Sequence, residues 1–199
     1  MTGTYFPLPE IQESNRTKPD GNTIIALDFA LALPKQASMA ADPTQRVLFI
    51  STGNAVRSIF AEYLLNNNKI SKGRFKAFSA GSQPTGTVDP YVIEILREHY
   101  KINASRARSK SWDEFRNTQV DMVITVCDRA RESCPLFPGQ PEIANWNIPN
   151  PYDDDRPNVD LFNKFKEVAQ QIQTRIQLLC SFPPEKLAHL RTKPAAKRR

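Results

Sequence analysis

The stretch from Val47 to Leu65 constrains the fold of this chain more than any other part of its sequence. The four apolar residues Val47–Ile50 are typical of a buried strand. A polar turn that contains Gly53 follows, and after it the apolar residues lie on one face of a helix: Ile59, Phe60, Tyr63 and Leu64. A strand that leads through a tight turn into a helix directs backbone N–H groups at one point, where the helix dipole also favours an anion. The stretch therefore predicts an oxyanion site in this turn.

Apolar runs and helical patterns alternate along the chain after residue 45. Strands are expected at residues 47–50, 75–80, 120–126 and, more weakly, 142–146. Helices are expected at residues 57–65, 90–99 and 160–179, with a short helix at 112–115. Asp89 is placed to cap the second of these helices, and Pro90 suits a first helical position. Strands separated by helices predict an α/β fold with a four-stranded, parallel, doubly wound sheet, and a ligand site at the carboxyl ends of the strands.

The composition of the two ends predicts a central domain at residues 45–182. Residues 1–44 carry scattered prolines and are expected to form an irregular arm with one short helix at 24–33, while residues 183–199 form a basic tail. No apolar run approaches the roughly 20 residues of a membrane helix, and no secretory signal is evident, so a cytoplasmic protein is expected. The net charge is +6, and the basic tail lacks interleaved aromatic residues, so nucleic acid is not an expected partner.

Ser51 and Arg57 stand at the two ends of the turn, with five residues between them. Arg57 adds a planar guanidinium that matches the oxygens of a tetrahedral anion. The residues expected to bind the oxyanion are Thr52, Gly53, Asn54, Ala55, Val56, Arg57 and Ser58. A serine hydroxyl does not ionise at neutral pH without a base, and the histidines lie elsewhere in the sequence, at His99 and His189. Covalent chemistry at Ser51 is therefore not expected, and a plain strand–helix turn is the alternative to an anion site.

The same stretch resembles the low-molecular-weight tyrosine phosphatase superfamily, and within it the thiol-dependent arsenate reductases. The resemblance covers about residues 46–190. It rests on residues 47–49, 52–54, 57–58 and 61–65 and on four further segments: Ser79–Ser82, Pro84–Gly86, Arg108–Trp112 and Phe137–Pro141. It implies the flavodoxin-like strand order of that superfamily. It also implies that relatives carry a catalytic cysteine where this chain has Ser51.

Cys127 and Cys134 lie seven residues apart, directly after the third expected strand. In the arsenate reductases that the chain resembles, the loop thiolate attacks arsenate, the cysteine matching Cys127 displaces arsenite, and the one matching Cys134 resolves the disulfide. The resemblance thus implies a cysteine relay served by an external thiol reductant of the thioredoxin or glutaredoxin type, with no bound cofactor and no metal. Two idle thiols are the alternative interpretation. Cys180 is expected to pack in the core.

Asn150-Pro151 stands where relatives carry Asp-Pro. That aspartate is the general acid of the phosphatases, and an asparagine in its place donates a hydrogen bond but transfers no proton. The acidic residues that follow, Asp153, Asp154 and Asp155, are possible substitutes, although a solvated acidic turn is the favoured interpretation. The candidate catalytic residues are Ser51, Arg57, Cys127, Cys134 and Asn150.

Three functions follow from these observations. The first is an arsenate-reductase-like oxyanion-binding protein, whose chemistry is impaired by Ser51 and Asn150. The second is a non-catalytic protein on the same scaffold that binds phosphate, arsenate, sulfate or a phosphoprotein. The third is a low-molecular-weight phosphatase that uses Ser51, and it is the least favoured because no nearby residue in the sequence activates that hydroxyl.

Overall fold

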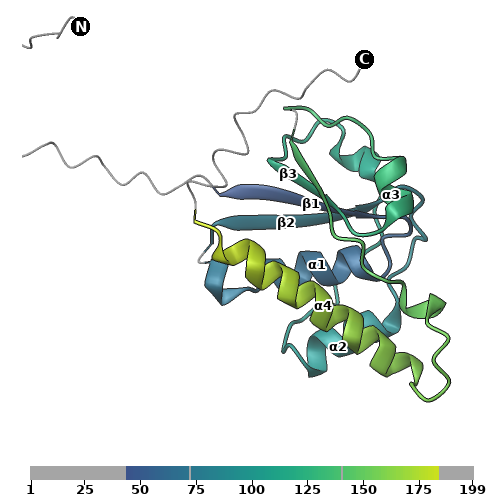
Figure 1. Ribbon diagram of the computed structural model, residues 1–199. Coiled ribbons are helices and arrows are strands. Elements are labelled where there is room, and N and C mark those ends of the chain that lie inside the picture. The colour runs from purple at the N-terminus through teal and green to yellow at the C-terminus, as the bar shows by residue number, and fades with distance from the viewer. Residues whose placement is uncertain (1–43, 72, 140, 184–199) are drawn as a thin grey trace, which may run out of the picture. The chain divides into compact units, whose positions relative to one another are not determined.

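A four-stranded parallel sheet forms the centre of the computed structural model, which describes residues 44–71, 73–139 and 141–183 (Figure 1). The strands are β1 (Gln45–Ser51), β2 (Phe75–Gly81), β3 (Met122–Thr125) and β4 (Glu142–Asn145). They lie in the order β2-β1-β3-β4, and each neighbouring pair is parallel. The predicted parallel sheet and its flavodoxin-like order are confirmed. The expected N-terminal arm with its helix at 24–33, and the basic tail, lie outside the described residues apart from Thr44 and Pro183.

Helices cover both faces of this sheet, which confirms the doubly wound arrangement. Helices α1 (Arg57–Asn66), α2 (Pro90–Glu98) and α4 (Leu161–Ser181) lie on one side. The short α3 (Asp128–Glu132) and the 3₁₀ turn η2 (Trp112–Phe115) lie on the other. Successive side chains of β1 point to opposite faces, so that Val47 and Phe49 enter the larger core while Leu48 and Ile50 enter the smaller one.

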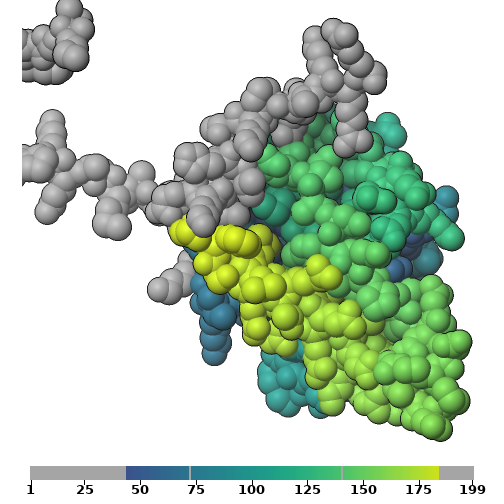
Figure 2. All heavy atoms as spheres, viewed as in Figure 1, coloured from purple at the N-terminus to yellow at the C-terminus, as the bar shows by residue number. Residues whose placement is uncertain are grey.

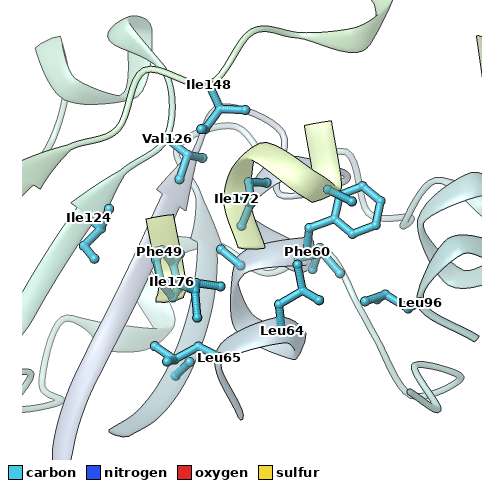
Figure 3. Packing of buried hydrophobic residues seen from close by; sticks show 14 of the residues in the cluster. Phe49, Phe60, Leu64, Leu65, Leu96, Ile124, Val126, Ile148, Ile172 and Ile176 are labelled. Atoms are coloured by element: carbon cyan, nitrogen blue, oxygen red, sulfur yellow. The ribbon is translucent and has the colours of Figure 1, made fainter. Parts of the chain in front are cut away.

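The larger core fills the space between the sheet, α1 and α4 (Figure 3). Phe49 from β1, Phe60 from α1 and Ile172 from α4 are all fully buried there. Helix α4 supplies buried residues three and four positions apart, as its sequence predicts: Phe165, Val168, Ala169, Ile172, Ile176 and Leu179. Cys180 is buried in the same core, as expected. The opposite face of α4, yellow in Figure 2, lies at the surface.

Side-chain caps explain where two of the helices begin. The carboxylate of Asp89 accepts a hydrogen bond of 2.9 Å from the N–H of Tyr91, and Pro90 occupies the first position of α2. The carboxylate of Asp160 accepts a bond of 2.9 Å from the N–H of Asn163. Asp160 is therefore the cap of α4 and not its first residue, so the expected start of this helix was wrong by one position.

Some expected elements differ from the structure. The third strand is expected at 120–126 but pairs over 122–125, and Asp121 and Val126 next to it still donate backbone hydrogen bonds to Arg46 and Ile50. Helix α3 was not expected, since five residues are too few to leave a periodic pattern. Helix α1 buries Ala61 and Leu65 besides the expected residues, whereas Tyr63 is only half-buried. None of the helices in the described part of the chain is long and apolar enough to cross a membrane.

Candidate oxyanion site

The turn between β1 and α1 lies at the carboxyl edge of the sheet, as the sequence predicts. Val56 immediately precedes α1, whose first N–H groups have no acceptor within the helix. The chain bends at Asn54, where φ is +47°. Asparagine tolerates this left-handed conformation better than most residues because its short side chain bonds to nearby groups. The bend closes the backbone of residues 51–56 into a compact loop in front of the helix.

The carbonyl groups of this loop are turned outward onto the segment that follows β2. Four of them accept hydrogen bonds of 2.9–3.1 Å from backbone N–H groups: Ser82 to Ser51, Gln83 to Thr52, Thr85 to Gly53 and Asp89 to Ala55. In a trans peptide the C=O and the following N–H point in opposite directions. The N–H groups of the next residues therefore point into the loop. Within the described residues, the backbone N–H groups of Thr52, Gly53 and Val56 have no hydrogen-bond acceptor.

Ser51 ends β1 inside this loop and is 3% exposed. Its Oγ lies 2.8 Å from the Oγ of Ser58 and accepts a hydrogen bond of 3.1 Å from the N–H of Asn54. The Nδ2 of Asn54 donates to the Oγ of Ser58 at 2.9 Å. No carboxylate or imidazole among the described residues is bonded to Ser51, and His99 lies at the far end of α2. The structure therefore offers this hydroxyl no base.

Arg57 begins α1 and is half-buried beside the loop, where its Nη1 donates to the carbonyl of Ile148 at 3.0 Å. Burial lowers the pKa of Arg57, and the charges of Cys127 and Asp153 act in the opposite direction. Because an arginine stays protonated at neutral pH, the site keeps a positive charge next to its N–H groups.

Lys110 and Gly81 support the loop from outside. The N–H of Lys110 donates to the Oδ1 of Asn54 at 2.7 Å, and its carbonyl accepts from the N–H of Gly81 at 2.7 Å. The Lys110 ammonium pairs with Glu62 at 3.0 Å, and these side chains are only 12% and 17% exposed. A Cβ on Gly81 would lie 2.7 Å from the carbonyl oxygen of Thr52. The shape of the loop is thus set by its neighbours in α1, β2 and the segment before η2.

Of the two candidate cysteines, the structure brings Cys127 to the loop. Its Sγ lies 3.6 Å from the Oγ1 of Thr52, and the residue is 7% exposed. Cys134 follows α3, is half-buried and donates to the carbonyl of Pro135 at 3.7 Å. Burial raises the pKa of the Cys134 thiol. Both cysteines are free thiols, and within the described residues no hydrogen bond joins Cys134 to the loop.

Asn150 does not bond to the loop within the described residues. Its Nδ2 donates to the Oδ1 of Asp153 at 2.8 Å, and it is the Asp153 carboxylate whose charge acts on Arg57. Asp154 is bound by Arg156, whose hydrogen bonds lower the pKa of Asp154 to about 2. Asp154 therefore carries no proton to donate at neutral pH. Of the three acidic residues after Asn150, Asp153 is the one whose charge acts to raise the pKa of Arg57.

A pocket of about 330 Å³ opens beside Thr52, and the sequence did not indicate it. Its other lining residues come from three separate segments: Ser82, Gln83, Trp112, Arg129, Glu132 and Ser133. No motif links these residues, because the fold alone brings the segments together. The pocket adjoins the oxyanion loop through Thr52.

Comparisons with known proteins agree with this geometry. The family model described as "Low molecular weight phosphotyrosine protein phosphatase" matches residues 46–193. "Arsenate reductase 2" of Staphylococcus haemolyticus (strain JCSC1435) is 30% identical over 131 residues, which cover 66% of this chain and 92% of that protein.

Two solved structures share the fold. The arsenate reductase from Archaeoglobus fulgidus DSM 4304 has a TM-score of 0.53 and 28% identity, and the match covers 68% of this chain and 99% of that one. The low molecular weight protein tyrosine phosphatase from T. tengcongensis has a TM-score of 0.55 and 25% identity, with 68% and 97% covered. The chain therefore belongs to the low molecular weight phosphotyrosine protein phosphatase family, and arsenate reductases are among its relatives.

Proposed function

We propose that this protein is an arsenate-reductase-like oxyanion-binding protein in which residue 51 no longer supplies the nucleophile. The orientation of the loop carries the proposal: its carbonyls are bonded outward, its N–H groups point inward, and Arg57 lies beside them. Backbone N–H groups that converge in front of a helix suit a tetrahedral anion. Arsenate, phosphate and sulfate are the ligands of matching shape and charge.

The contacts of two residues support weak or absent turnover at residue 51. The hydroxyl of Ser51 is bonded to Ser58 and to the N–H of Asn54, and no base among the described residues accepts its proton. Asn150 replaces the acid with an amide, which transfers no proton. Arsenate reductases among the relatives favour arsenate as the anion. A thioredoxin- or glutaredoxin-type reductant belongs to this proposal, and the expected cytoplasmic location stays a prediction.

A binder of phosphorylated proteins or small phosphate esters is the second candidate. The pocket beside Thr52 favours it, because it offers room next to the loop that a free oxyanion does not use. A phosphatase that uses Ser51 has less support, since no described residue activates the hydroxyl.

Calorimetric titration of arsenate, phosphate and sulfate into the full-length protein tests the proposal. We expect all three anions to bind, and we expect Arg57→Ala to weaken binding at least about tenfold, since a charge-assisted hydrogen bond is worth about 1.5–3 kcal/mol. Arg97→Ala is the matched control, because Arg97 is exposed on α2 and, among the described residues, pairs only with Glu98. Absence of binding in the wild-type protein would contradict the proposal.

Two activity assays separate the candidate functions. Arsenate-dependent oxidation of a thiol reductant supports reductase chemistry, and release of phosphate from a small aryl phosphate supports phosphatase chemistry. Anion binding with neither activity supports a purely binding role. Tighter binding of a phosphopeptide than of inorganic phosphate favours the second candidate over the first.

A further inference from the structure

The pocket beside Thr52 connects the oxyanion loop with helix α3. It has a volume of about 330 Å³, and its walls include Thr52 from the loop and Arg129 and Glu132 from the helix. Sites for small molecules commonly measure about 300–1,000 Å³. A free oxyanion occupies the loop alone. A ligand that is held in the loop by its anion therefore has room for a second group in this pocket.

Two opposite charges in this pocket lack partners among the described residues. Arg129 and Glu132 are exposed, form no ion pair with each other, and use neither side chain in a hydrogen bond or ion pair elsewhere in the described part of the chain. Arg131 of the same helix differs, since it lies 3.9 Å from Asp128 and does not line the pocket. The pocket thus offers one cation and one anion to a ligand.

The rest of the wall combines one aromatic ring with small polar groups. Trp112 is partly buried against the smaller core and also lines the pocket. Ser82, Gln83 and Ser133 add two hydroxyl groups and an amide. An indole offers a surface for a carbon framework, whereas the polar groups do not favour a wholly apolar substituent. The lining suits a short carbon chain that ends in both a positive and a negative charge.

We propose that the site binds a phosphorylated free amino acid, which rests on anion binding in the loop and specifies the small phosphate ester of the second candidate function. The phosphate binds the inward N–H groups and Arg57. The α-carboxylate pairs with Arg129, the α-ammonium pairs with Glu132, and the carbon chain lies against Trp112. A residue inside a peptide has neither of these terminal charges, so the pocket selects the free amino acid over a phosphorylated protein.

Calorimetric titration of O-phospho-L-serine and O-phospho-L-tyrosine into the full-length protein tests the inference. The two esters place the phosphate at different distances from the terminal charges, so the tighter one reports the length that the site spans. We expect at least one of them to bind about tenfold more tightly than its N-acetylated, C-amidated form, because each partly exposed ion pair contributes a few-fold in affinity. Inorganic phosphate should bind about as tightly as the blocked form.

Blocking one terminal charge at a time assigns each charge to its partner. Amidation of the carboxylate should weaken binding to the wild-type protein but not to Arg129→Ala. Acetylation of the amine should weaken binding to the wild-type protein but not to Glu132→Gln. Arg131→Ala is the matched control, since this residue lies on the same helix outside the pocket, and it should behave as the wild-type protein does. All three variants should bind inorganic phosphate normally, which also shows that they are folded.

The same titrations distinguish the failure of this inference from the failure of the proposed function. Inorganic phosphate that binds while free and blocked esters bind equally overturns the role of the pocket and leaves the oxyanion function standing. Phosphate and esters that all fail to bind overturn both. Sensitivity to amidation that persists in Arg129→Ala, or to acetylation in Glu132→Gln, overturns the inference. Unphosphorylated tyrosine that binds as tightly as its phosphate ester also overturns it, because such a ligand does not use the loop.

Discussion

The side-chain carbonyl of Asn54 accepts a hydrogen bond of 2.7 Å from the backbone N–H of Lys110, 56 residues further along the chain. The amide nitrogen of the same side chain donates to Ser58 at 2.9 Å. One side chain thus connects the loop both to the first turn of α1 and to the segment before η2. Asn54 therefore helps to hold the loop in shape.

We expect Asn54→Ala to lose about 2–4 kcal/mol of unfolding free energy and most of its affinity for anions. The substitution removes two hydrogen bonds worth about 1 kcal/mol each and puts alanine into a left-handed conformation that costs about 1–2 kcal/mol. Asn54→Gly is the matched control, because it removes the same bonds without the strain. In urea unfolding, the free energy of unfolding of Asn54→Gly should lie between those of the wild-type protein and Asn54→Ala. Wild-type anion affinity in both variants would contradict the role given to this side chain.

Gly81→Ala should distort the loop, because the new Cβ would lie 2.7 Å from the carbonyl oxygen of Thr52 and 3.0 Å from the Cβ of Asn54. Neither neighbouring atom lies at the end of a flexible side chain, so the loop backbone has to move. We expect the affinity for phosphate in calorimetry to fall at least about tenfold, as for loss of one charge-assisted bond. Gly73→Ala is the control: its Cβ meets open space and its φ is +79°, so it should destabilise the fold without weakening anion binding. Equal affinities in both variants would refute this account.

Glu62→Gln should lower the free energy of unfolding by about 1–3 kcal/mol, because it leaves the poorly exposed Lys110 ammonium without its charged partner. The Glu62 carboxylate also accepts a hydrogen bond from Ser79. Glu114→Gln is the matched control, since Glu114 pairs with Arg108 at an exposed position and such pairs contribute about 0–1 kcal/mol. Urea denaturation measures both changes. A Glu62→Gln effect no larger than that of Glu114→Gln would show that the pair does not support the loop.

Ser51→Cys should create a thiol that ionises well below the ordinary cysteine pKa of about 8.5. The inward N–H groups and the Arg57 guanidinium both favour the thiolate, as they favour an oxyanion. Titration of thiolate absorbance against pH measures the value, with the wild-type protein subtracted to remove its own cysteines. Arg57→Ala in the same background should move the pKa back upward. An ordinary pKa in Ser51→Cys would mean that the loop exerts no useful positive potential.

Alkaline pH should destabilise the protein partly through Tyr152. Its hydroxyl donates to Asp89, and this bond raises the pKa of Tyr152 from its ordinary value near 10 to about 12. Between these values the unfolded chain binds fewer protons than the folded one, so stability falls as pH rises from 10 to 12. Tyr152→Phe should make this fall less steep. Burial also raises the pKa of Tyr63 and Tyr100, so part of the slope should remain, and unchanged slopes would contradict the assignment.

The sequence was sufficient to predict the sheet and the loop because their signals are local. Residues 47–65 contain the strand, the bend and the helix in one continuous stretch. The approach of Cys127 to the loop was also predictable, since the carboxyl ends of parallel strands meet at one edge of a sheet. Neither inference needs the contacts of a particular side chain.

The supports of the loop were not predictable from the sequence. The outward carbonyls depend on residues 82–89, and the Asn54 side chain depends on Lys110. These segments are irregular, so no periodicity marks which of their N–H groups meets which carbonyl. Similarly, nothing in a run of three aspartates indicates that Asp153 acts on Arg57 while Asp154 is bound to Arg156. Contacts between irregular segments decide both outcomes.

The outward bonds of the loop carbonyls have a consequence for how such chains diverge. In the function proposed above, the shape of the anion-binding loop depends on residues 82–89 and Lys110, while reactivity depends on position 51. Exchange of a single side chain at that position can therefore abolish catalysis and leave the receptor intact. Under that proposal, a lineage with this architecture can lose or regain a reaction at one position without rebuilding its ligand site.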